Sequence, residues 1–158
     1  MTTADAERQT SRQPRGAARA FRTLIGLVYL FGAPTHLYFA LVNPAGYRDM
    51  GAWAPPITPL SREFWDAWFI PNARFFGVTL AFAELAIALL ILSRGRATAL
   101  GFIAATGFHL ALAALFGMWP YTVPTALLLA YMTTLEFDDG LATRLISRYS
   151  SDKEKGRR

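Results

Sequence analysis

The chain contains no cysteine among its 158 residues. Disulfide bonds, thiolate metal sites and thiol–quinone redox relays made by this chain alone are therefore excluded. Charged residues are also scarce, at 17% of the chain, whereas hydrophobic residues make up 53%. An ordinary soluble domain of this size would not carry so much apolar surface, so much of that surface is expected to face lipid.

Four apolar segments are candidates for membrane-spanning helices. They are residues 21–42, 75–92 and 97–119, and the shorter segment 121–137. We expect an all-α protein, a four-transmembrane-helix bundle formed by residues 21–140. Residues 1–20 are predicted to be a disordered, basic cytoplasmic arm, and residues 141–158 a basic cytoplasmic tail.

Lysine and arginine residues are distributed asymmetrically around these segments. Only three of the 16, Arg48, Arg62 and Arg74, lie in the connection between the first and second segments. All the others precede the first segment or, for Arg22, lie at its very start, lie between the second and third, or follow the fourth. Positive charge favours the cytoplasmic side, and four crossings return the chain to the side where it began. The sequence therefore predicts a multi-pass protein of the cell membrane with both termini cytoplasmic.

The connection formed by residues 43–74 is long and is predicted to lie outside the cell. Thr58 and Pro59 are typical of a helix start, which predicts a short amphipathic helix at the membrane interface. Its apolar residues are expected to share one face; they are Leu60, Phe64, Trp65, Trp68 and Phe69. This helix is either an aromatic anchor in the interface or a lid over a cavity between the helices.

Four residues of this outer connection are candidate ligand-binding residues. Trp65 and Trp68 would contact a ligand if the short helix is a lid. Asn72 and Arg74 lie at the predicted outer start of the second segment, where Arg74 could bind an anion. The alternative for Arg74 is a side chain that snorkels to the interface.

A single carboxylate, Glu84, lies near the middle of the second segment. A lone carboxyl group at this depth costs at least ~3 kcal/mol on insertion scales, so it is expected to be protonated or paired inside the bundle. Gly77, Ala81 and Ala88 share its helical face, and small residues let another helix approach closely. Glu84 should therefore face protein, either as a neutral residue that joins two helices or as a group that handles protons or binds a ligand.

Two histidines, His36 and His109, lie in the first and third segments. Helix rise places both about 18 Å from the inner ends of their segments, and Glu84 about 14 Å from the outer end of its own. In a hydrocarbon core of ~30 Å the three residues fall at one level. The sequence therefore predicts one polar site in the bundle core, with Glu84, His36 and His109 as candidate catalytic residues.

Such a site could pass or store a proton, or hold a quinone carbonyl or a small polar ligand. Two histidines on different helices also match the axial ligands of a b-type haem, but no second haem signal accompanies them, so haem is disfavoured. No metal site is predicted, because two histidines and one glutamate are a weak indication. The expected partners are the lipid bilayer, a lipophilic small molecule and a membrane or peripheral redox protein; no nucleic acid is expected.

Residues 81–101, AFAELAIALLILSRGRATALG, resemble the DoxX-like family of four-helix integral membrane proteins. In that family a glutamate in the second helix precedes an apolar run, a short basic turn and the third helix, which correspond here to Glu84 and to Arg94 with Arg96. The resemblance implies an accessory or subunit of a quinone-linked membrane redox system, such as thiosulfate:quinone oxidoreductase. The alternative is a non-enzymatic bundle that binds a lipophilic ligand or scaffolds a partner protein. A weaker similarity, to EXPERA-fold membrane proteins, implies a sterol or lipid isomerase, so whether the protein is an enzyme is left open.

Overall fold

The computed structural model describes residues 16–53, 58–138 and 140, and in these residues every regular element is a helix. The four longest helices are α2 (Gly16–Leu41), α5 (Ala73–Leu92), α6 (Arg96–Phe116) and α7 (Trp119–Met132). The connection between α2 and α5 contains α3 (Gly46–Trp53), α4 (Pro59–Glu63), the π-helix η1 (Phe64–Phe69) and the 3₁₀-helix η2 (Ile70–Asn72). The prediction of an all-α protein is confirmed for the described residues.

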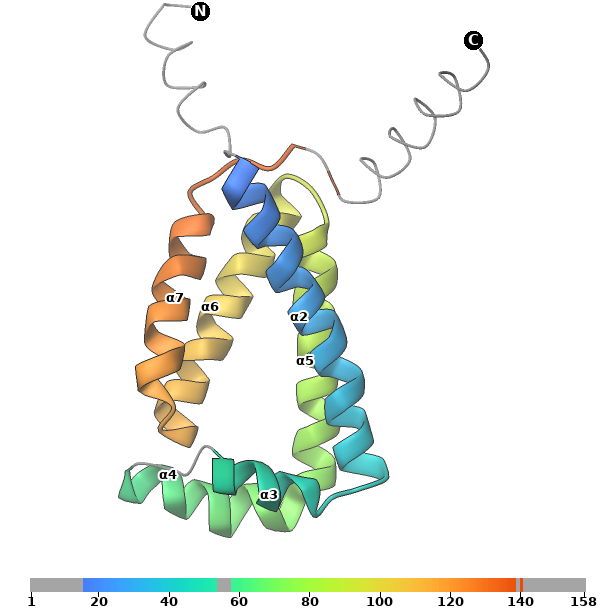
Figure 1. Cartoon of the computed structure of the whole chain (residues 1–158), viewed down its shortest axis with the longest axis vertical. Helices are drawn as coiled ribbons and strands as arrows, with labels where there is room; N and C mark the ends of the chain where they lie inside the picture. Colours follow the sequence, from blue (N-terminus) through green and yellow to red (C-terminus); the bar gives the residue numbers. More distant parts are fainter. Residues whose placement is uncertain (1–15, 54–57, 139, 141–158) are drawn as a thin grey trace, which may run out of the picture.

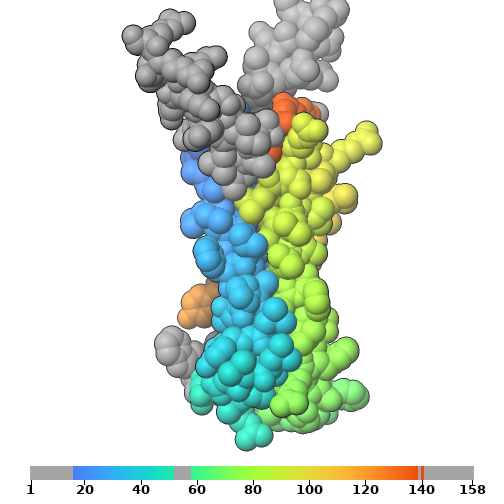
Figure 2. Space-filling model, turned by 90° about the vertical axis from the view of Figure 1, so that its right-hand side faces the viewer, coloured from blue at the N-terminus to red at the C-terminus, as the bar shows by residue number. Residues whose placement is uncertain are grey.

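The four long helices run along the molecule, and α3 and α4 lie across one end of them (Figure 1). Helix α2 packs along α5, α7 packs along α6, and α5 also packs against α6. Figure 2 shows α2 and α5 side by side above the connection that joins them. The start of α2 and the residues after α7 lie together at the end opposite α3 and α4 (Figure 1). We call these the terminal end and the connection end.

Three helical stretches are long and apolar enough to cross a membrane: Gly16–Leu41, Pro59–Leu92 and Arg96–Phe116. These agree with the first three predicted segments and support an integral membrane protein. Helix α7 has 14 residues, which at the usual rise is about 21 Å and shorter than a hydrocarbon core of ~30 Å. Helix α2 begins before the predicted start at residue 21, and most of the predicted arm and tail lies outside the described residues.

A buried arginine closes the packed core at the terminal end. Arg22 is 2% exposed; its Nε donates to the carbonyl of Ile91 at 2.9 Å, and its Nη2 donates to the carbonyls of Leu92, at 3.3 Å, and Ser93. These carbonyls end α5 and lack partners within the helix, and a cation there also complements the helix dipole. Arg22 therefore caps α5, and its guanidinium lies 5.0 Å from the ring centre of Phe137, which follows α7.

The short helix of the outer connection begins as predicted. The Thr58 side chain accepts from the backbone N–H of Ser61 at 3.1 Å, and the Ser61 hydroxyl accepts from the backbone N–H of Thr58 at 3.0 Å. This reciprocal capping box satisfies backbone donors at the start of α4. The chain then turns from α4 into α5 (Figure 1) through the π-helix, the 3₁₀-helix and Pro71, all of which interrupt regular α-helical hydrogen bonding.

The π-helix changes which residues of the connection face inward. Phe69 is 2% exposed, whereas Leu60 and Trp68 are 66% and 61% exposed. The residues predicted to share one face therefore differ in burial, and the π-helix does not keep the 3.6-residue period from which that face was derived. Phe69 instead joins a second core with Tyr47 of α3 and Ala73 of α5, at the connection end.

Candidate functional site

Glu84 lies on the buried face of α5 and is 8% exposed. Gly77, Ala81 and Ala88 are buried on the same helix, so the small-residue face is turned toward protein. Gly32 of α2 stands directly opposite the carboxyl group. A Cβ added to Gly32 would lie 2.9 Å from Glu84 Cδ and would overlap Oε2. The missing side chain of Gly32 therefore leaves the space that the Glu84 carboxyl group occupies.

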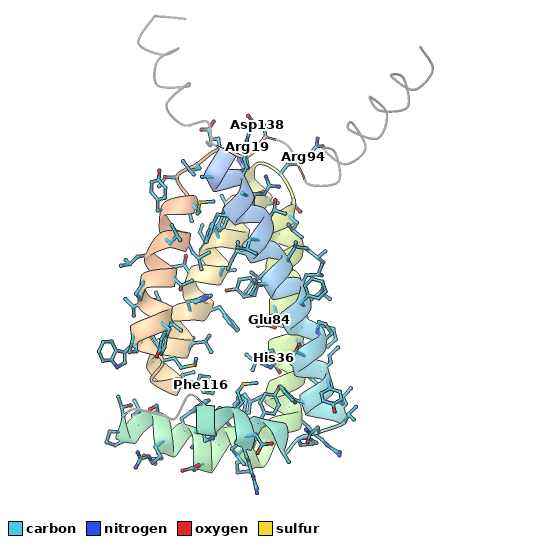
Figure 3. The ribbon with its side chains drawn as sticks, viewed as in Figure 1. Arg19, His36, Glu84, Arg94, Phe116 and Asp138 are labelled. Atoms are coloured by element: carbon cyan, nitrogen blue, oxygen red, sulfur yellow. The ribbon has the colours of Figure 1, made fainter. Side chains whose placement is uncertain are left out.

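His36 of α2 is the ionisable partner of Glu84. Its Nε2 lies 3.6 Å from Glu84 Oε1, and its side chain is 18% exposed. The contact joins α2 to α5, which fits the extensive packing of these two helices. Figure 3 shows both side chains on the inner side of their helices, between the terminal end and the connection end. The predicted pairing of Glu84 with a histidine across the bundle is therefore present for His36.

Tyr47 of α3 holds the other side of the imidazole. Its hydroxyl lies 2.9 Å from His36 Nδ1 and 3.3 Å from the His36 carbonyl oxygen, and the two rings stack with centres 5.9 Å apart. Tyr47 is 1% exposed, and its hydroxyl stands against Gly77, where a Cβ would overlap it. Burial first, and the nearby Glu84 charge second, raise the pKa of Tyr47 to about 12, so its hydroxyl keeps its proton at neutral pH.

The Tyr47 contacts bear on whether His36 Nε2, the nitrogen nearest Glu84, is a donor or an acceptor. If the Tyr47 hydroxyl donates to Nδ1, then a neutral imidazole carries its proton on Nε2, facing Glu84. If Tyr47 donates to the His36 carbonyl, then a neutral imidazole carries its proton on Nδ1 and presents an acceptor at Nε2. The Nε2–Oε1 separation of 3.6 Å is an ion-pair distance and is longer than a hydrogen bond. A carboxyl group and an imidazole this close are chemically suited to storing or passing a proton.

The second carboxyl oxygen, Glu84 Oε2, is buried and has no hydrogen-bond partner among the described residues. An unsatisfied buried polar atom costs roughly 1–3 kcal/mol, so native structures contain few of them and these are often at functional sites. One carboxyl oxygen of Glu84 thus faces an ionisable partner, His36, and the other oxygen has no hydrogen-bond partner among the described residues.

His109 does not join this group. Its Nδ1 lies 2.9 Å from the Tyr29 hydroxyl of α2 and 3.0 Å from the carbonyl oxygen of Ala105. Within the described part of the chain no hydrogen bond or ion pair links His109 to Glu84. His109 and Tyr29 therefore form a separate polar contact between α6 and α2. The same described residues contain no group of three or more His, Cys, Asp or Glu side chains that could hold a metal ion.

An apolar pocket lies beside His36 toward the connection end. Its empty space is about 500 Å³ including its open side, and about 90 Å³ of it is open to the centres of water molecules. Trp65 and Phe69 form part of the wall, stacked with ring centres 4.7 Å apart. The residues that line it come from α2, α3, η1, α5, α6 and the turn after α6; they are His36, Tyr47, Met50, Trp65, Phe69, Leu80, Leu112, Phe116 and Met118.

The four predicted ligand-binding residues lie in different places. Trp65 lines the pocket, whereas Trp68 is exposed and does not. Asn72 is exposed and donates from Nδ2 to the Trp68 carbonyl at 2.9 Å, which supports the turn into α5. Arg74 is exposed at the start of α5 and also lies outside this pocket.

Two tyrosines complete the polar contacts and were not among the predicted site residues. Tyr29 precedes His36 by seven residues on one helix, a spacing that places both on one face and that could have indicated it. Tyr47 belongs to α3, a helix in the long connection. No periodic pattern in the sequence indicates that this helix packs against the bundle. No family model, curated protein or solved structure matches the chain.

Proposed function

We propose that the protein is a DoxX-like accessory or subunit of a quinone-linked redox system in the cell membrane. In this proposal all four long helices cross the bilayer and both termini are cytoplasmic. Arg19, Arg94 and Asp138 gather at the terminal end (Figure 3), as an even number of crossings requires. The short α7 is accommodated by local thinning of the bilayer around it.

The observation that carries this proposal is the approach of Glu84 Oε1 to His36 Nε2, 3.6 Å apart inside the bundle. Reduction of a quinone takes up protons together with electrons, and oxidation of a quinol releases them. A subunit at the quinone site must therefore supply or accept protons where bulk water is absent. A buried carboxyl–imidazole pair performs this step, and its partner protein supplies or removes the electrons.

Quinone retained by the purified protein tests this role. The protein is extracted gently from membranes, and its quinone and any second subunit are identified by mass spectrometry and absorption spectroscopy. We expect quinone to copurify with the unchanged protein and with Glu63→Gln, which alters an exposed glutamate of α4. Glu84→Leu should retain much less. Absence of both quinone and a redox partner from the unchanged protein would contradict the proposal.

The pocket beside His36 favours a second candidate function, a non-enzymatic bundle that binds a lipophilic ligand. Its wall is apolar apart from a few hydrogen-bonding groups, as in most small-molecule sites. In that case lipophilic ligands would raise the unfolding temperature of the purified protein, but added quinone and reductant would show no turnover.

A further inference from the structure

We propose that the connection end binds one phospholipid molecule, with its phosphate head in a charged surface hollow and one acyl chain in the apolar pocket beside His36. The two spaces adjoin each other, because Trp65 lines both of them. A charged hollow next to an apolar pocket matches a ligand that has a charged head and a hydrocarbon chain. Such a lipid site goes beyond the proposed redox role and does not depend on it.

The apolar pocket suits a hydrocarbon chain. Its lining presents almost no polar surface. The Tyr47 hydroxyl contacts His36 Nδ1, and His36 Nε2 lies near Glu84, so these side chains offer mainly carbon atoms to the pocket. A ligand group with hydrogen-bonding atoms would lose its hydration there without gaining a partner. An acyl chain has no such atoms beyond its ester group, so it enters without this cost.

The size of the pocket favours a chain over a ring. The space open to the centres of water molecules is about 90 Å³, which is smaller than a cavity of ~150 Å³ that holds benzene. Met50 and Met118 have flexible thioether side chains that adapt to the shape of a chain. Leu80 and Leu112 belong to helical stretches of membrane-spanning length. The pocket therefore lies among helices that lipid chains surround.

The charged hollow lies between α3 and the segment formed by α4, η1 and η2. Its empty space is about 860 Å³ including its open side, and its lining residues are Arg48, Gly51, Arg62, Trp65, Asp66 and Ile70. A Cβ added to Gly51 would lie 2.9 Å from Trp65 Nε1, so the indole packs against the backbone of α3. The same indole stacks on Phe69. Trp65 is therefore held between the two spaces by contacts from both sides of the connection.

The charges of the hollow match a phospholipid head. Arg48 of α3 and Arg62 of α4 bring two guanidinium groups to it, and Asp66 of η1 brings a carboxylate. In the part of the chain that the structure describes, none of these three side chains forms an ion pair. Guanidinium groups bind phosphate oxygens through paired hydrogen bonds, and a carboxylate accepts from an ammonium group. The head of phosphatidylethanolamine carries both a phosphate and an ammonium group.

The two spaces also lie in the order in which a phospholipid carries its head and chain. Leu60 and Trp68, on the segment that lines the hollow, are exposed, and tryptophan is enriched at the level of lipid head groups. The hollow is lined only by residues of the connection. The pocket extends further, to His36, Leu80 and Leu112 of the long helices. A lipid with its phosphate in the hollow would therefore direct a chain toward the pocket.

Photolabelling of the full-length protein in dodecyl maltoside micelles tests the chain site. The probe is a phosphatidylethanolamine with a diazirine on one acyl chain, which light converts to a carbene that inserts into nearby bonds. We expect labels at Leu112 or Met118, mapped by mass spectrometry. Leu112→Trp, which fills the pocket, should reduce labelling at Met118 at least about tenfold. Leu110→Trp, on an exposed face of the same helix, should leave it unchanged.

Loss of the two arginines tests the head site. Arg48→Gln combined with Arg62→Gln should reduce labelling in the pocket roughly threefold to tenfold, because the same molecule fills both spaces. Arg19→Gln combined with Arg94→Gln removes the same charge from the terminal end, where both side chains are exposed, and should leave labelling unchanged.

Three competitors separate the head from the chain. Unlabelled phosphatidylethanolamine should displace the probe. Monogalactosyl diacylglycerol with the same chains lacks the phosphate and should displace much less of it. Glycerophosphoethanolamine has the head but no chains, and it should also displace little.

Labels spread over exposed positions such as Leu110, and equal in Leu110→Trp and Leu112→Trp, would overturn the chain site. Site mapping on the unchanged protein decides this even if Leu112→Trp fails to fold. Equal displacement by the galactolipid, or full labelling of the double arginine variant, would overturn recognition of the head. Displacement by glycerophosphoethanolamine as strong as by the whole lipid would show a site for a free phosphate ester and would also contradict the proposal. Labelling of the pocket in protein that retains no quinone would support the lipid site and contradict the redox role alone.

Discussion

Gly32 and Glu84 approach so closely that a methyl group on the glycine would overlap the carboxyl group. This places a backbone of α2 directly beside the one carboxylate of α5. The same helix, one turn further on, brings His36 to that carboxylate. A site of this kind depends as much on the missing side chain as on the ionisable ones.

Gly32→Ala should destabilise the protein because the carboxyl group must move away from its place beside His36. Overpacking of this kind costs about 1–3 kcal/mol. Gly107→Ala in α6 is the matched control, since nothing lies within 4 Å of its added Cβ. It should be neutral or stabilising by up to ~1 kcal/mol, because alanine favours a helix more than glycine does. Unfolding in mixed micelles measures both, and equal effects would show that Gly32 has no special role.

Tyr47→Phe should remove the hydroxyl contact to His36 and cost about 1 kcal/mol. The pH dependence should change as well. The pKa of Tyr47 rises from 10 in the unfolded chain to about 12 in the folded protein. Its contribution to stability is therefore complete below pH 10 and is lost as the pH rises through about 12. Unfolding at a series of alkaline pH values should show this loss in the unchanged protein and in the exposed control Tyr38→Phe, but a smaller one in Tyr47→Phe.

Arg22→Met should destabilise the terminal end by roughly 1.5–3 kcal/mol, the usual worth of hydrogen bonds to a charged group. The variant leaves the carbonyls of Ile91 and Ser93 without the guanidinium that caps them. Arg19→Met changes an exposed arginine one turn earlier in α2 and should have little effect. Thermal unfolding compares the stability of the two variants. Similar losses of stability would mean that positive charge near the membrane stabilises the protein and that the cap on α5 does not.

Labelling of single cysteines tests the topology, because the chain has no native cysteine. A cysteine in place of Arg62, exposed on α4, should react with a membrane-impermeant maleimide in intact cells. Cysteines in place of Arg94 or Asp138, both exposed at the terminal end, should react only after permeabilisation. External labelling at position 138 but not at 94 would show that α7 does not cross the bilayer.

Much of the fold could be predicted because apolar length and positive charge are strong local signals. The basic turn at Arg94 and Arg96 ends α5 and begins α6 as expected, with Gly95 at φ +57°. Thr58 and Pro59 correctly predicted where α4 starts. The inward-facing residues after it did not follow from the sequence, because the π-helix at Phe64–Phe69 departs from the 3.6-residue period used for the prediction.

The candidate site could be predicted only in part. Depth along the helices correctly predicted that His36 lies near Glu84. Depth does not determine how a helix is rotated about its own axis. His109 lies on a face of α6 that meets Tyr29 instead. Tyr47 reaches His36 through the fold of the outer connection, and a contact made by a long loop cannot be derived from helix period or rise.

A double-mutant cycle between Glu84 and His36 tests the central claim most directly, since it measures the contact itself. The variants are Glu84→Gln, His36→Phe and their combination, with Glu84 and His109→Phe as the matched second cycle. The account predicts a coupling free energy of about 0.5–3 kcal/mol for Glu84 with His36, and a value within ~0.5 kcal/mol of zero for Glu84 with His109. A coupling near zero for Glu84 with His36 would contradict a shared polar site inside the bundle.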